Sequence, residues 1–197
     1  MQLNQRTVSP SGGPLLPRIA NAILLRRAFY DAVAADRRAI GPAGAIVCLS
    51  AIMRESVGLY QLSQGSRAWG VLLALIVVFA LVRWVIYASI AYPIARVLGG
   101  GTVEYARLLR CLGFAETPAM LSVVGFVLDE QFLPWIQFGV GAWLLAATII
   151  AVRSATGVGA GRAIAIGTLA FAAYLALGVG LDLVAHVPDA VPSTPAP

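Results

Sequence analysis

Residues 68–92 read AWGVLLALIVVFALVRWVIYASIAY, and Arg83 is the one charged residue in this stretch. A helix of roughly 20 apolar residues is long enough to cross the hydrocarbon core of a bilayer. The whole chain agrees with this interpretation, because it is 59% hydrophobic and 12% charged with a mean hydropathy of +0.84. A soluble domain has about half apolar and a quarter charged residues. The sequence therefore predicts a membrane protein.

Four other apolar segments of similar length accompany this one along the chain. The five predicted spans cover residues 42–60, 68–92, 108–128, 135–152 and 163–185. Each is close to the length that a bilayer requires. The predicted fold class is therefore all-α: a polytopic integral membrane protein whose domain, residues 41–187, is a bundle of five transmembrane helices.

The segment before the first span is helical in pattern and too charged to cross a membrane. Residues 1–17 are polar, contain no apolar signal segment, and are predicted to be a flexible cytoplasmic tail. At 100° per residue, residues 18–40 form an amphipathic helix that would lie in the cytoplasmic interface. A soluble helix packed on the cytoplasmic ends of the bundle remains an equal alternative. The arginines expected to face lipid head groups here are Arg26, Arg27, Arg37 and Arg38.

The basic residues, which are all arginine, predict the orientation. Eleven of the 14 fall on one side of the five predicted spans, namely Arg6, Arg18, Arg26, Arg27, Arg37, Arg38, Arg96, Arg107, Arg110, Arg153 and Arg162. Loops rich in arginine stay cytoplasmic. The N-terminus is therefore expected in the cytoplasm, and residues 188–197 form a disordered external tail. The net charge of +5 is modest and sorted by side of the membrane, which argues against a nucleic-acid surface with its concentrated basic stripe.

Two charges lie well inside the predicted spans. Arg83 is nine residues before Tyr92, and Glu116 is eight residues after Leu108, so both lie about 12–14 Å from the cytoplasmic edge. A lone charge near the bilayer centre costs roughly 2.5–3.5 kcal/mol. Equal depth on antiparallel helices predicts an Arg83–Glu116 ion pair. It is interpreted first as a structural contact, with a transport or proton-relay role as the alternative.

The third span has an unusual start, RLLRCLGFAETPAML over residues 107–121. Arg107 and Arg110 are expected to hold its cytoplasmic entry at the head groups. Pro118 removes a backbone hydrogen bond and is expected to kink the helix, and Thr117 is placed to cap the freed carbonyl. The stretch predicts a bent, polar-lined helix that faces the interior of the bundle.

Outside the Arg83–Glu116 pair, the sequence gives weak evidence for a metal, cofactor or catalytic site. Asp182 and His186 are four residues apart and are interpreted as a solvated structural pair, with metal binding the weaker alternative. His186 would be available to a haem or a pigment magnesium if the chain belonged to such a complex. No cofactor is predicted apart from bound lipid. Neither a nucleophile–base set nor a metal-ligand motif is found, so the chain is not predicted to be an enzyme.

With this layout, the chain resembles bacterial members of the Yip-one domain family, named for Ypt/Rab-GTPase-interacting proteins. The resemblance rests on the amphipathic N-terminal segment, the five spans and the sequence YARLLRCLGFAETPAML. The stretch AVRSATGVGAGRAIAI over residues 151–166 is similar as well. The resemblance implies a protein of the bacterial inner membrane that binds or organises other proteins and has no established catalytic residues.

Three functional hypotheses follow. The first is a non-enzymatic scaffold or accessory subunit of a larger membrane assembly, whose partners are membrane lipids and other integral membrane proteins or the chain itself. The second is a small transporter or channel that uses Arg83 and Glu116. The third is a membrane-shaping protein that acts through the helix at 18–40.

Overall fold

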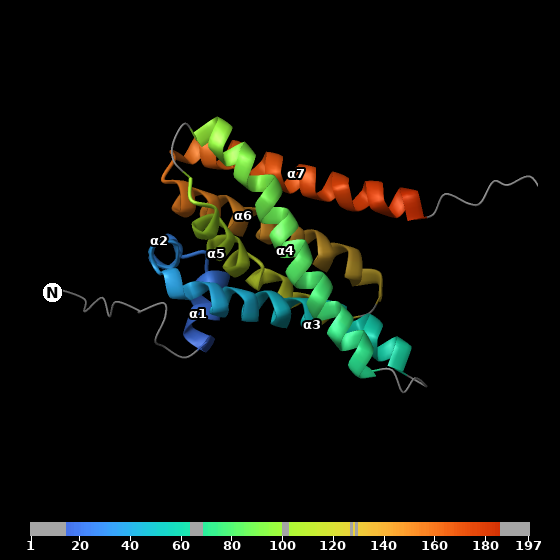
Figure 1. Cartoon of the computed structure of the whole chain (residues 1–197). Helices are drawn as coiled ribbons and strands as arrows, with labels where there is room; N and C mark the ends of the chain where they lie inside the picture. The colour runs from blue at the N-terminus through green and yellow to red at the C-terminus, as the bar shows by residue number, and fades with distance from the viewer. Residues whose placement is uncertain (1–14, 64–68, 100–102, 127, 129, 186–197) are drawn as a thin grey trace, which may run out of the picture.

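The computed structural model describes residues 15–63, 69–99, 103–126, 128 and 130–185. Every element among them is helical, which confirms the all-α prediction (Figure 1). The elements are α1 (Leu15–Ile23), α2 (Arg27–Ala35), η1 (Arg37–Ala39), α3 (Ile40–Ser63), α4 (Trp69–Gly99), α5 (Tyr105–Ala115), η2 (Thr117–Phe126), η3 (Glu130–Phe132), α6 (Leu133–Thr156) and α7 (Ala160–Ala185), where η denotes a 3₁₀ helix.

Three helical stretches within the described residues are long and apolar enough to cross a membrane. They are α4, the continuous run Tyr105–Gly125 made of α5 and η2, and α6. These stretches correspond to the second, third and fourth predicted spans. The first and fifth predicted spans lie on α3 and α7, which are helical, and their passage through a membrane stays a prediction.

The run α5–η2 is the centre of the bundle. Its two parts contact α1, α2, α3, α4 and α6, whereas α4 packs mainly on α3, α5 and α7. Figure 1 shows α5 between α2 and α4, and α4 crossing the bundle obliquely. Leu108, Leu112 and Phe114 are among its fully buried side chains. The third predicted span is therefore surrounded by protein along most of its length.

Gly113 lets three helices meet at one point. A Cβ atom at this position would lie 2.8 Å from the Ala43 Cβ and 3.1 Å from the Trp84 ring, closer than atoms normally approach. The Trp84 indole N–H also donates a hydrogen bond to the Leu109 carbonyl at 3.0 Å. Helices α3, α4 and α5 are thus locked together through a residue without a side chain.

The prediction of one helix over residues 18–40 is wrong. Leu25 has a left-handed φ of 52° and separates α1 from α2, a conformation that ends a helix. Asp36 is extended and accepts a hydrogen bond from the Arg38 backbone N–H at 2.9 Å, which starts η1. A short polar side chain that caps a new turn is a common reason for such a break.

The apolar face of α2 is covered by protein. Phe29, Tyr30, Val33 and Ala34 are buried, and α2 contacts α5 and α6. The Phe29 and Phe114 rings meet edge to face at 5.3 Å. Burial raises the pKa of the Tyr30 hydroxyl above its usual range. This arrangement matches the alternative in which the segment packs on the bundle.

The covered face of α2 also bears on the membrane-shaping hypothesis. An interfacial helix needs its apolar side free to enter the lipid, and the α2 side chains that would do so contact the bundle. Both predicted tails fall mostly outside the described residues, which begin at Leu15 and end at Ala185.

Candidate functional site

The site begins with the break between α5 and η2. In a continuous α-helix the residue at 118 would donate its N–H to the Phe114 carbonyl, but Pro118 has no N–H. The Thr117 hydroxyl donates to that carbonyl instead, at 2.6 Å. The helix ends at Ala115 and continues as η2 after Glu116. The helix type therefore changes next to Pro118, whereas a bend of the helix axis there stays a prediction.

Glu116, at this break, joins two other helices. One carboxylate oxygen, Oε2, lies 3.5 Å from Arg54 Nη2 on α3 and 3.6 Å from Arg83 Nη2 on α4. The Arg54 side chain is 26% exposed, that of Arg83 is 32% exposed and that of Glu116 is 16% exposed. We call this set the charged triad. It connects α3, α4 and the α5–η2 run through a single carboxylate.

The structure brings Arg83 and Glu116 together, as the depth argument expected, and adds Arg54. From the sequence alone, the adjacent charges of Arg54 and Glu55 are most simply interpreted as the outer boundary of the first predicted span. In the structure Arg54 lies inside α3, which runs from Ile40 to Ser63. The predicted spans already place Arg54 12 residues from the cytoplasmic end of the first span and Arg83 nine residues from that of the second, a difference in depth of about one helical turn. This similar depth is the signal that would have found Arg54.

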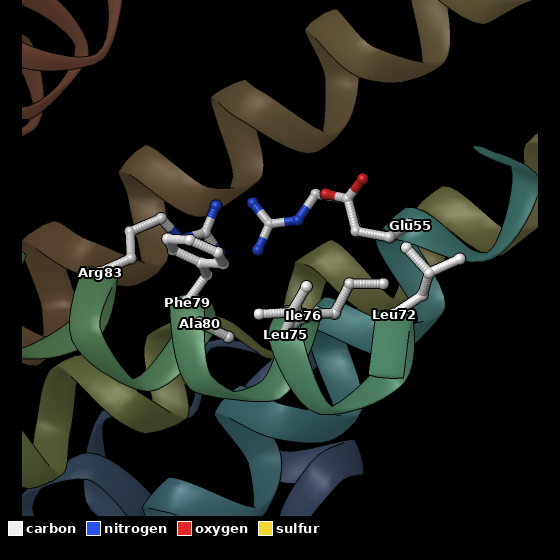
Figure 2. A pocket seen from close by; sticks show the side chains of 9 residues that line it. Glu55, Leu72, Leu75, Ile76, Phe79, Ala80 and Arg83 are labelled. Atoms are coloured by element: carbon white, nitrogen blue, oxygen red, sulfur yellow. The ribbon is translucent and has the colours of Figure 1, made fainter. Parts of the chain in front are cut away.

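A groove of about 250 Å³ opens between α3 and α4 beside the charged triad. Its polar lining comes from Arg54, Glu55 and Arg83, and its other lining residues are apolar: Ala51, Leu72, Leu75, Ile76, Phe79 and Ala80. Figure 2 shows Arg83 at one end and Leu72 and Glu55 at the other, with the apolar side chains of α4 between them. The groove therefore combines an apolar wall with two guanidinium groups.

Arg110 does not face lipid head groups, which corrects the prediction for this residue. Its side chain is buried, and Nη2 donates to the Ala34 carbonyl at 3.0 Å. Ala34 lies in the last turn of α2, where carbonyl groups have no partner within the helix. A cation there is also favourable for the helix dipole. Arg110 thus fixes the C-terminus of α2 to α5.

The other predicted head-group arginines are more accessible. Arg107 is partly buried, and Arg26, Arg27, Arg37 and Arg38 are exposed. Arg27 makes an ion pair with Asp31 one turn later at 3.7 Å. Contact between these arginines and lipid stays a prediction.

The described residues contain no group of three His, Cys, Asp or Glu side chains that could hold a metal ion. The proposed Asp182–His186 pair falls outside this statement, because His186 and the Asp182 side chain lie outside the part of the chain that the structure describes. The charged triad, by contrast, offers fixed charge and hydrogen-bond donors next to an apolar groove. Such an arrangement suits binding of an anion or stabilisation of a helix junction.

Comparison with protein families gives one match. The model of the Yip1 domain, the Yip-one domain discussed above, matches residues 22–181, which include every helix from α2 to α6 and most of α7. The comparisons with curated proteins and with solved structures found no match. The family match together with the long apolar helices identifies a membrane protein.

Proposed function

This chain belongs to the Yip1 domain family, and from that premise we propose that it is a non-enzymatic membrane scaffold or accessory subunit. It binds other integral membrane proteins, or a second copy of itself, within a larger assembly. The Yip1 domain family is not known as an enzyme family, which supports a role in binding.

The proposed topology has five spans. They are α4, the α5–η2 run and α6, which are long and apolar enough to cross a membrane, together with α3 and α7. Eleven of 14 arginines then lie on the side of the N-terminus, which supports a cytoplasmic N-terminus and an external C-terminus. The resemblance to bacterial members supports the inner membrane as the location.

The observation that carries the proposal is an uncovered face of small residues on α7. One side of this helix packs inside the bundle through Ala163, Ile166 and Ala170, and a Cβ on Gly167 would lie 2.8 Å from the Ile149 side chain of α6. Three alanines lie on the opposite side of α7 and are exposed, Ala165, Ala172 and Ala176, with the exposed Leu169 between the first two. In lipid, small residues let helix backbones approach closely and bind by packing. We call Ala165, Ala172 and Ala176 the small-residue face.

The test is a gentle purification from native membranes. The full chain carries a tag at its N-terminus, is solubilised in a mild detergent, and its stoichiometric companions are identified by mass spectrometry. The double variant Ala172→Leu/Ala176→Leu is expected to lose these companions, because two bulky side chains prevent close packing. Ala74→Leu, which changes an exposed alanine of α4, is the matched control and should keep them.

Two results would count against the scaffold proposal. One is recovery of the wild-type chain alone as a monomer, and the other is an unchanged set of companions in the α7 double variant. A loss of companions in both variants would show a general loss of folding, so circular dichroism of each purified variant accompanies the experiment.

The charged triad favours a second candidate, a small transporter or channel. Charges within membrane helices often mark the path of an ion or substrate, and Arg54 and Arg83 both line an open groove. The variant Arg83→Leu/Glu116→Gln tests this candidate in reconstituted vesicles. A folded variant with normal assembly and lost flux would support transport, whereas loss of folding alone would support a structural triad.

A further inference from the structure

Helix α7 lies at the edge of the bundle and touches it along one side. It packs mainly on α4 and α6, and Figure 1 shows it along one side of the molecule. Between Arg162 and Asp182 its sequence contains no charged residue. In a membrane the hydrophobic effect gives no side of such a stretch a preference for the bundle over lipid. Specific contacts with the bundle therefore decide which side of α7 faces inward.

The inward side of α7 is a narrow stripe with the three- and four-residue spacing of one helix face. Its described members are buried or partly buried: Ala163, Ile166, Gly167, Ala170, Phe171 and Tyr174. The hydroxyl of Tyr174 is the polar side-chain group of this stripe. Apolar burial is non-directional, whereas a hydrogen bond is strong only over a narrow range of angles. Tyr174 is therefore the member of the stripe that is best able to fix the rotation of the helix.

Tyr174 makes two contacts with α4. Its ring centre lies 4.9 Å from that of Tyr87, and its hydroxyl makes a side-chain hydrogen bond with Arg83. Arg83 is itself paired with Glu116 in the charged triad. The Tyr87 hydroxyl donates to the Thr148 hydroxyl of α6 at 3.2 Å. Within the described residues, a series of polar contacts thus runs from the centre of the bundle to α7.

The position of Tyr174 relates these contacts to the small-residue face. Ala172 and Ala176 are two residues before and after it, and two residues turn an α-helix by about 200°. A Tyr174 side chain held against α4 therefore keeps both alanines on the exposed side. We propose that Tyr174 sets the rotation of α7 about its own axis, and with it the face that α7 presents to a partner. The rotation needs no partner, whereas its use in binding rests on the proposed scaffold function.

The rotation of α7 is measured by electron paramagnetic resonance in lipid vesicles. A nitroxide label is attached to Phe171→Cys, in the inward stripe, or to Ala172→Cys, on the exposed side. The full-length chain also carries Cys48→Ala and Cys111→Ala, so that no other thiol is labelled. Oxygen dissolved in the lipid should collide more often with the label at 172 than with the label at 171. In Tyr174→Phe the ratio of the two collision rates is expected to fall toward one.

Tyr87→Phe is the matched control, because it removes a hydroxyl from the same pair of rings. That hydroxyl joins α4 to α6 through Thr148, so its loss should leave the ratio unchanged. An unchanged ratio in Tyr174→Phe would overturn the proposal. So would an equal fall in Tyr87→Phe, since the pair of rings rather than the Tyr174 hydroxyl would then hold the helix. A loss of helix content in Tyr174→Phe, measured by circular dichroism, would overturn a role confined to rotation.

Binding is measured on the tagged full-length protein from native membranes. Its stoichiometric companions are expected to fall about tenfold in Tyr174→Phe, the scale of one lost hydrogen bond to a charged group, and to remain in Tyr87→Phe. A changed rotation with unchanged companions would overturn the part of the proposal that concerns the partner. A wild-type chain without companions would contradict the scaffold function, and the collision ratio would still decide whether Tyr174 sets the rotation of α7.

Discussion

Helix α4 and the α5–η2 run are neighbours of membrane-spanning length, and their hydropathy and burial are inversely related. The most apolar 18-residue stretch of α4 has a mean hydropathy of 2.6, and 22% of it is buried. The corresponding stretch of Tyr105–Gly125 has a mean hydropathy of 1.2, and 67% of it is buried. In a soluble protein the most apolar helix is the one that is buried. In this protein the most apolar helix is mostly exposed, as expected of a helix whose side chains face lipid.

Three polar side chains of the central run have partners in neighbouring helices or at the helix break. Arg110 bonds the end of α2, Glu116 pairs with two arginines, and Thr117 satisfies the carbonyl that Pro118 leaves free. Buried polar groups are stable only when they are bonded. The comparison therefore predicts that stability depends on polar contacts in α5–η2 and little on any single side chain on the outer face of α4.

The largest effect is expected at Glu116, where α5–η2 meets both other helices. Glu116→Gln leaves two arginines without their counter-charge. It should lower the free energy of unfolding by about 2–4 kcal/mol, somewhat less than the loss of one partner from a fully buried pair. The effect is reduced because Arg54 and Arg83 are 26% and 32% exposed, so water screens their charges in part. Arg83→Gln removes one of the two ion pairs and should cost about half as much. The measurement is unfolding in mixed detergent micelles followed by circular dichroism.

The same two variants can contradict the conclusion that stability depends on the polar contacts of α5–η2 more than on α4. If Arg83→Gln, a change on the outer helix, destabilised the protein more than Glu116→Gln, the carboxylate would not be the centre of the junction. Phe79→Leu, on the exposed side of α4, should change the unfolding free energy by about 0.5 kcal/mol or less and serves as the control.

Sequence reasoning reached part of this junction. Depth along two antiparallel helices brought Arg83 and Glu116 to one level, because helical rise is a fixed quantity. It missed Arg54, because the adjacent charges of Arg54 and Glu55 resemble the edge of a weakly apolar span, although the predicted span 42–60 continues beyond them. Arg110 was misplaced for a related reason: its partner is a backbone carbonyl of α2, and no side-chain pattern reveals such a partner.

The next effect is steric and concerns Gly113. Gly113→Ala places a methyl group 2.8 Å from Ala43 Cβ and 3.1 Å from the Trp84 ring, and overpacking of this kind costs about 1–3 kcal/mol. Gly70→Ala on α4 meets nothing within 4 Å and should be neutral or stabilising by up to about 1 kcal/mol, from helix propensity. Thermal unfolding of both variants in detergent measures the difference. Equal midpoints would show that α3 and α4 can move apart at no cost.

The smallest effect concerns the cap at the helix break. Thr117→Val removes the hydrogen bond to the Phe114 carbonyl and should cost about 1 kcal/mol. In the background Pro118→Ala, a new N–H becomes available for the same carbonyl, so the cost of Thr117→Val should shrink toward zero. The coupling is measured as a double-mutant cycle of unfolding free energies. Additive costs would mean that the Thr117 hydroxyl does not replace the missing backbone donor.

The N-terminal segment shows where periodicity stops being informative. At 100° per residue, one amphipathic pattern runs through residues 18–40 and places Phe29, Tyr30 and Val33 on its apolar side, and α2 buries these three side chains. The pattern does not reveal the turn at Leu25, where a residue without special conformational freedom adopts φ 52° because α1 and α2 both pack on the bundle. Nor does it distinguish lipid from protein as the neighbour, since both accept apolar side chains.

The 3₁₀ conformation of η2 has a consequence for bilayer thickness. A 3₁₀ helix rises about 2.0 Å per residue and an α-helix about 1.5 Å, so the ten residues of η2 extend about 5 Å further than they would as α-helix. The short central run thereby gains reach without gaining residues. Hydrophobic mismatch costs a fraction of a kcal/mol per Å, and a segment able to exchange the two helix types could adjust its length to thinner or thicker membranes.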